Sequence, residues 1–152
     1  CRRLVFAQLG SPLTIRGCTF RNRIFSSGHQ TLLARRGEVT DAMVAYHAAR
    51  ARGGAALIVT EAISIHASAY FNEYTPIAYE DRCIDGFRRL AAAVHAHDCR
   101  LVGQLFHPGA EVAGIMEDGS RPVPWAPSMH TQERYLVTAR PMPLAMIEEI
   151  ID

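Results

Sequence analysis

Ala55-Ala56-Leu57-Ile58-Val59-Thr60 is the stretch that decides the fold, and it follows directly after Gly53-Gly54. The run is continuously apolar rather than alternating, which is typical of a parallel strand covered on both faces. The two glycines suit the end of a helix, because glycine accepts the left-handed backbone found after a helix C-terminus. This part of the chain therefore predicts a helix that leads at once into a buried parallel strand, as in an α/β fold.

The residues before this stretch predict the elements that lead into it. Pro12 to Phe20 alternates apolar and polar residues around Arg16-Gly17, which favours a small β-hairpin. Ile24-Phe25 suits a short buried strand. Thr40 can cap free backbone N–H groups at the start of a helix that runs to about Arg52.

The residues after it continue the alternation of strands and helices. The apolar strand is expected to end at Glu61-Ala62, and a third strand covers Arg100 to Leu105. Phe106 to Pro141 is rich in Pro and Gly and too long for a plain connection, which favours a functional excursion. A helix begins near Asp85, and a further helical pattern near the end of the chain includes Ile147, Ile150 and Ile151.

The order of elements predicts an α/β fold with a parallel sheet built from βαβ units. Neither the glycine pattern of a dinucleotide-binding Rossmann fold nor that of a P-loop is present. The pattern better suits the N-terminal part of a (β/α)₈ TIM barrel, with about three βα units preceded by a β-hairpin. A whole barrel takes roughly 250 residues, so residues 1–152 are expected to form a partial barrel domain.

Composition narrows the class of protein. The chain has 49% hydrophobic and 20% charged residues and a formal net charge of +1, which is ordinary for a globular protein and indicates no nucleic-acid or membrane partner. Cys1, Cys18, Cys83 and Cys99 form no C-x-x-C motif, which favours reduced thiols in a cytoplasmic protein. The spacing of the seven histidines predicts no metal site.

Small and polar residues gather where the predicted strands end. They are Ser27 to Gln30 after the first strand, Glu61-Ala62 after the second, and Gln104 with His107 at the third. Ligands of α/β folds bind at this edge of the sheet. Ser27 and Gly28 leave room for a flat ligand against the backbone, with the alternative that they begin an ordinary loop.

Several short motifs occur in order along the chain: Pro12-Leu13-x-Ile15, Asn22-Arg23-Ile24, Tyr46-x-x-x-Arg50-Ala51-x-Gly53-Gly54, Glu61-Ala62, Val94-His95, Gln104-Leu105-x-His107-x-Gly109 and Pro127-Ser128. Together they resemble the N-terminal part of the old yellow enzyme family of NADH:flavin oxidoreductases. Gly28-His29-Gln30-Thr31 is most similar to the branch of dienoyl-CoA reductases, trimethylamine dehydrogenase and related N-demethylases.

The resemblance implies an FMN-binding TIM barrel that uses NAD(P)H as reductant and acts on an activated alkene or an amine. It implies that the backbone of Ser27, Gly28 and His29 lies beneath the flavin ring. It further implies that Gln30 lies near flavin N5 and O4, that Ala62 lies beside the ring, and that Gln104 bonds the pyrimidine edge. An amide such as Gln104 can donate and accept at once, as that edge requires, and the alternative for Gln104 is a satisfied amide of the barrel core. The catalytic residues stay unknown.

Three departures from the family pattern matter. Gln30 stands where the dehydrogenase branch has a cysteine bonded to the flavin, so FMN is expected to bind non-covalently. Ala110 stands where the family has an arginine. The later barrel strands, with the substrate-binding His motif and the phosphate-binding loops, are absent, and an iron–sulfur cluster could lie only in that missing region.

Two hypotheses therefore stay open at the level of sequence. In the first, the chain is an FMN oxidoreductase or the N-terminal portion of one. In the second, it is a non-catalytic part-barrel that another chain completes. Both need the missing part of the barrel, from the same longer chain or from a partner subunit, and both predict a chain that associates through its open sheet edges.

Overall fold

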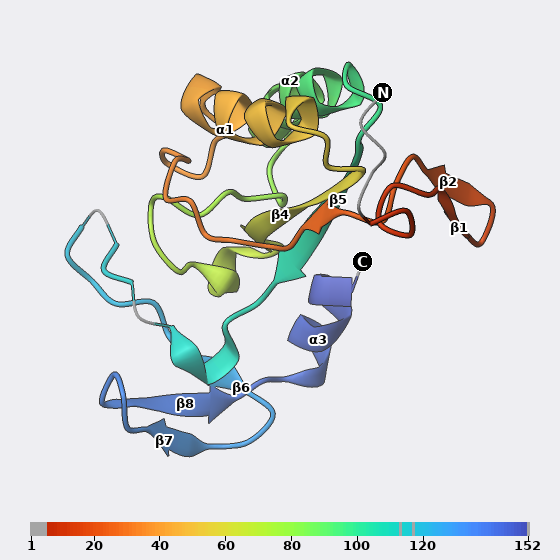
Figure 1. Cartoon of the computed structure of the whole chain (residues 1–152). Coiled ribbons are helices and arrows are strands. Elements are labelled where there is room, and N and C mark those ends of the chain that lie inside the picture. The colour runs from red at the N-terminus through yellow and green to blue at the C-terminus, as the bar shows by residue number, and fades with distance from the viewer. Residues whose placement is uncertain (1–5, 113, 117, 152) are drawn as a thin grey trace.

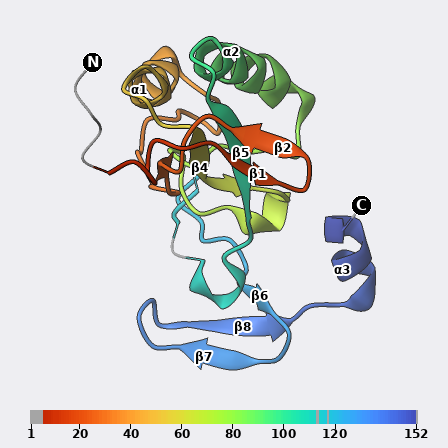
Figure 2. The ribbon, with the colours of Figure 1, turned by 45° about the vertical axis from the view of Figure 1, so that its right-hand side comes forward.

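A three-stranded parallel sheet forms the centre of the molecule in the computed structural model, which describes residues 6–112, 114–116 and 118–151 (Figure 1). Its order is β3-β4-β5, from Phe25–Ser26, Leu57–Ser64 and Arg100–Phe106. Helix α1 (Asp41–Arg52) connects β3 to β4, and α2 (Ile84–His95) connects β4 to β5. Both helices lie on the same side of the sheet in the two views (Figure 2). The βαβ order predicted from the sequence is confirmed.

Helix α1 begins and ends as the local sequence predicts. The Thr40 side chain accepts a hydrogen bond from the backbone N–H of Met43, which satisfies one of the free donors of the first turn. After the helix, Gly54 has a φ of +111°, in the region that only glycine enters at little cost. The turn therefore connects the end of α1 directly to β4.

The predicted hairpin at the start of the chain is also present. Strands β1 (Leu13–Ile15) and β2 (Cys18–Phe20) pair antiparallel. Arg16 and Gly17 both have positive φ, 47° and 80°, as a two-residue turn of this hand requires. The hairpin stands apart from the parallel sheet in Figure 1.

The main core lies between the two helices and the sheet. Helix α2 presents Leu90 and Val94 to it, as the helical spacing predicts. Ile58 of β4 is fully buried there, which fits a central parallel strand. The buried members of this core are Val39, Met43, Ala51, Ile58, Leu90, Val94 and Cys99.

Strand β4 is longer than its apolar run indicates. The expected end at Glu61-Ala62 is wrong, because the strand continues to Ser64. Its pairing with β5 shifts register between Val59 and Ala62, where an irregularity interrupts the ladder. Glu61 therefore lies within the strand, at the irregularity.

The expectation that Ile24 and Phe25 are buried is wrong for this chain. Their side chains are 49% and 61% exposed, and Leu105 of β5 is 71% exposed. In the described part of the chain, no further strand pairs with the outer edge of β3 or of β5. These apolar residues have suitable strand chemistry but no second layer over them.

The excursion from Phe106 to Pro141 contains strands that the sequence analysis did not predict. A second sheet of order β6-β8-β7 is formed by Trp125–Ala126, Val137–Pro141 and His130–Gln132. It lies at the end of the molecule away from α1 and α2, and the short helix turn Gly109–Glu111 packs beside it (Figure 1). The predicted last helix, α3, covers Leu144–Ile151.

Two further observations concern the whole described region. Cys18, Cys83 and Cys99 are free thiols, and Cys1 lies outside the described residues. No described helix is long and apolar enough to cross a bilayer.

Candidate functional site

The fold brings three of the predicted site residues together at the carboxyl ends of the parallel strands. Ala62 of β4 and Gln104 of β5 are register partners. Gly28 follows β3, and a Cβ at this position would overlap Gln104 Oε1 and lie 3.0 Å from the carbonyl oxygen of Thr60. Gly28 and Ala62 thus both lie beside Gln104, and a side chain at position 28 would overlap the Gln104 amide.

The amide of Gln104 is available for a ligand. Its backbone N–H donates to Thr60 Oγ1 at 3.1 Å, which anchors the residue in the sheet. Among the described residues, its side-chain amide has no hydrogen-bond partner, and the residue is exposed. An exposed amide at a strand end can donate and accept together toward a planar ligand. This geometry fits the ligand hypothesis for Gln104 better than a satisfied core amide.

The segment after β3, residues 27–30, exposes its polar groups to solvent. Ser27, Gly28, His29 and Gln30 are all exposed. Among the residues that the structure describes, the Gln30 side chain makes only a long contact, from Nε2 to Thr75 Oγ1 at 3.5 Å. A contact of this length is weak, so the Gln30 amide can turn to another acceptor without losing a strong bond.

Gln30 and Ala62 also line a cavity of about 450 Å³ at this edge of the sheet. Its other walls come from β5 and the excursion, including Phe106, His107, Arg134 and Tyr135. Arg134 and Tyr135 belong to the turn between β7 and β8, which the sequence analysis did not connect with the site. Their place could not be predicted because it depends on the second sheet folding back toward β5.

His107 uses both ring nitrogens within the protein. The backbone N–H of Gly109 donates to Nδ1 at 3.0 Å, so the hydrogen of the neutral ring lies on Nε2 and is donated to Ser68 Oγ at 3.0 Å. The Ser68 hydroxyl then donates to His66 Nδ1 at 2.7 Å. Burial, and next the nearby His66 ring, lower the pKa of His107, which favours this neutral form. His107 is therefore held as a packing residue beside the cavity.

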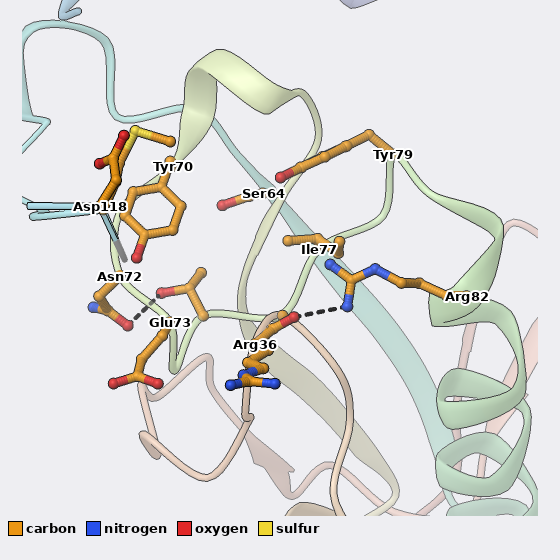
Figure 3. Close-up of a pocket in the computed structure, with 12 residues that line it drawn as sticks. Arg36, Ser64, Tyr70, Asn72, Glu73, Ile77, Tyr79, Arg82 and Asp118 are labelled. Carbon is orange, nitrogen blue, oxygen red and sulfur yellow. Dashed lines mark hydrogen bonds between the residues drawn. The ribbon is translucent and has the colours of Figure 1, made fainter. Parts of the chain in front are cut away.

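The close-up in Figure 3 shows a second cavity of about 470 Å³, which sequence reasoning missed. Arg82 Nη1 donates to the carbonyl oxygen of Arg36 at 2.8 Å across one wall. On another wall, Thr75 Oγ1 donates to Asn72 Oδ1 at 3.1 Å. Thr75 lines this cavity and also contacts Gln30, so it is the link between the two cavities.

Glu61 is predicted from the sequence among the polar residues at the strand ends, but sequence reasoning gave it no role in the site. Its side chain is fully buried next to Ala62, and both carboxylate oxygens accept hydrogen bonds from Thr31. The available signal is a charged residue that follows an apolar run within one strand. Within the described residues, no group of three or more His, Cys, Asp or Glu side chains is placed to hold a metal ion.

Comparison with known proteins gives a consistent result. The family model described as "NADH:flavin oxidoreductase / NADH oxidase family" matches residues 8–152. An NADH oxidase from Thermoanaerobacter brockii is 32% identical over 148 residues, which cover 96% of this chain and 22% of that protein. A metal reductase from Desulforamulus reducens is 39% identical over 101 residues, which cover 66% of this chain and 15% of the relative.

Comparison with solved structures points to the same group of proteins as the sequence comparison. The old yellow enzyme homologue from Zymomonas mobilis superimposes with a TM-score of 0.77 at 27% identity, over 95% of this chain and 42% of that structure. Its fold is a TIM barrel, so the predicted fold class is confirmed. The matched segment spans 15% to 42% of the three proteins named above.

Proposed function

The chain belongs to the NADH:flavin oxidoreductase / NADH oxidase family, and we propose that it forms the first part of a TIM barrel that binds FMN non-covalently. Membership in this family implies the use of a flavin and of NAD(P)H. We further propose that the completed protein passes hydride between NAD(P)H and an activated alkene or an amine. The observation that carries the proposal is the convergence of Gly28, Ala62 and the unpartnered amide of Gln104.

The chemistry of these residues fits a flavin ring. The flavin pyrimidine presents an N–H donor beside carbonyl acceptors, and the amide of Gln104 can satisfy one of each. The missing side chain at Gly28 and the small side chain of Ala62 allow a flat ring to approach the backbone. The exposed backbone of Ser27, Gly28 and His29 would lie beneath the ring, with Gln30 toward N5 and O4.

These residues bind and orient, and none of them is a catalytic acid or base in this proposal. When bound, FMN would supply the hydride-transfer chemistry. The Gln30 amide would donate toward the O4/N5 side of the ring and so stabilise the negative charge that gathers on the N1/C2=O and C4=O region on reduction. Gln104 would bind the pyrimidine edge of the flavin and so orient the ring relative to the sheet. His107, with both ring nitrogens engaged, would pack beside the site rather than exchange protons with a ligand.

The remainder of the barrel is part of the proposal. The chain spans 15% to 22% of the length of the metal reductase and NADH oxidase relatives. The open edges of β3 and β5 would pair with further strands of the same protein or of a partner subunit. Those strands would carry the residues that choose the substrate and bind the flavin phosphate.

The test is whether the protein, purified in its full expressed length, carries FMN. We expect a yellow protein that releases unmodified FMN on mild denaturation and is reduced by NADH or NADPH. The alternative, a non-catalytic part-barrel, predicts a colourless protein that neither retains added FMN nor consumes NAD(P)H. That result would refute the proposed function.

A further inference from the structure

Glu61 is a fully buried carboxylate that the proposed binding site does not yet use. It lies on β4 at the irregularity between Val59 and Ala62, and its exposed fraction is 0%. Its Oε2 accepts a hydrogen bond from the backbone N–H of Thr31, and its Oε1 accepts from Thr31 Oγ1 at 2.9 Å. Both oxygens therefore contact the same residue on a different segment.

An ionised carboxylate accepts hydrogen bonds through both oxygens, and both oxygens of Glu61 face donors on Thr31. A buried charge of this kind persists only when it is well hydrogen-bonded, and bonds to a charged acceptor are stronger than neutral ones. The contact with Thr31 is therefore a strong tether between β4 and the segment after β3.

The tether acts directly on the residues proposed to meet the flavin. Thr31 follows Gln30 in the chain, and its Oγ1 also accepts from the backbone N–H of Leu33 at 3.2 Å. On the other side, the carbonyl oxygen of Glu61 accepts from Thr60 Oγ1 at 2.9 Å, and Thr60 Oγ1 in turn accepts from the N–H of Gln104. Glu61 and its neighbour Thr60 thus connect the segment after β3 to the backbone of Gln104.

We propose that Glu61 is a positioning residue for the flavin site. It holds residues 27–31 in the position where Gln30 and the backbone of Gly28 lie next to the amide of Gln104. It also places a buried negative charge next to Thr31. The inference rests on the proposed function, because positioning has a meaning only if a flavin binds there. Glu61 itself does not touch the cofactor in this proposal.

The test compares three variants of the full-length protein. Glu61→Gln keeps the shape of the side chain but removes the charge and one accepting oxygen. Thr31→Val keeps the backbone N–H and the charge of Glu61 but removes the hydroxyl. Ser64→Ala is the matched control, because Ser64 is buried on the same strand and donates to the carbonyl oxygen of Ala69, away from Gln104. The measurements are the FMN dissociation constant, the midpoint potential of bound FMN and the melting temperature of the apoprotein.

We expect Glu61→Gln to weaken FMN binding about tenfold, the equivalent of one hydrogen bond to a charged group. Its bound FMN should have a more positive midpoint potential, because a buried negative charge disfavours reduction to an anionic ring. Thr31→Val should weaken FMN binding without that shift in potential. Ser64→Ala should lower the melting temperature only.

The inference would be overturned if Glu61→Gln and Thr31→Val behave like Ser64→Ala, with lower melting temperatures but unchanged FMN affinity and potential. If Glu61→Gln does not fold, the FMN affinity of Thr31→Val decides alone. Failure of the wild-type protein to bind FMN refutes the proposed function instead, so the two failures are distinguishable.

Discussion

The side chain of Gln104 occupies the space in which residue 28 would carry its Cβ. The two residues lie on segments 76 positions apart, yet a methyl group at Gly28 would overlap Gln104 Oε1. The absence of a side chain at position 28 thus decides where the amide of Gln104 can lie.

This relationship predicts that Gly28→Ala and Gln104→Leu impair the same interaction. Gln104→Leu should cost roughly 1–3 kcal/mol of FMN affinity, because the polar edge of the ring is left unpaired. Gly28→Ala should cost a similar amount by displacing the amide. The double variant should lose much less than the sum, since both changes remove one contact. Additive losses, or unchanged FMN retention in Gln104→Leu, would separate Gln104 from the flavin site.

Gln30 tests the orientation of the ring. A neutral amide donor toward O4 or N5 stabilises the charge that gathers on the N1/C2=O and C4=O region on reduction. Gln30→Leu should therefore lower the midpoint potential of bound FMN by roughly 20 mV, which corresponds to about 1 kcal/mol for a two-electron couple. FMN should also leave the wild-type protein unmodified on denaturation. Flavin that stays attached to the polypeptide would contradict the placement of Gln30.

His47 predicts a loss of stability in mild acid. Its ring is 2% exposed on α1, and neither nitrogen has a partner among the described residues. Burial, and then the charge of Arg50, lower the pKa of His47 from 6.5 to about 4. Above pH 6.5 the folded and unfolded states are both neutral at His47. Between pH 6.5 and 4 only the unfolded state takes up the proton, so stability falls as the pH falls, by up to roughly 3 kcal/mol.

The check is chemical denaturation at pH 7 and pH 5. His47→Phe should lose less stability than the wild type between these two values, because the titrating ring is gone. His95→Phe serves as the matched control, since His95 is an exposed residue of helix α2. Equal pH dependence in the wild type and His47→Phe would show that His47 is not held neutral by burial.

The open sheet edges predict association of the isolated chain. Leu105 on β5 is 71% exposed next to an unpaired edge, and such edges pair with other chains unless they are blocked. Residues 1–152 expressed alone should elute from size-exclusion chromatography as oligomers or aggregates. Leu105→Lys should reduce this association, whereas Leu136→Lys in the β7–β8 turn, at an 85% exposed position, should not. A monodisperse wild-type monomer with cooperative melting would count against the prediction.

Local signals in the sequence were enough to determine the order of the hairpin, the parallel strands and the helices. Thr40 and Gly54 act on the backbone within a few residues of themselves, so the ends of α1 could be predicted from their chemistry. The same holds for the turn at Arg16-Gly17. The grouping of Gly28, Ala62 and Gln104 was also predictable, because carboxyl ends of parallel strands meet at one edge of the sheet.

Long-range contacts decided the rest, and no local pattern encodes them. Short strands such as β6, β7 and β8 exist because they pair with one another, and β4 extends past Glu61 because β5 continues beside it. Glu61 is buried as a charge only because Thr31, thirty residues earlier, supplies both donors. The sequence by itself determined the hairpin, the three parallel strands in outline, the helices and the edge where a ligand would lie. Only the tertiary structure decided which polar groups are satisfied by the protein and which, like the amide of Gln104, are left for a ligand, since hydrogen-bond partners distant in the chain meet only in the folded state.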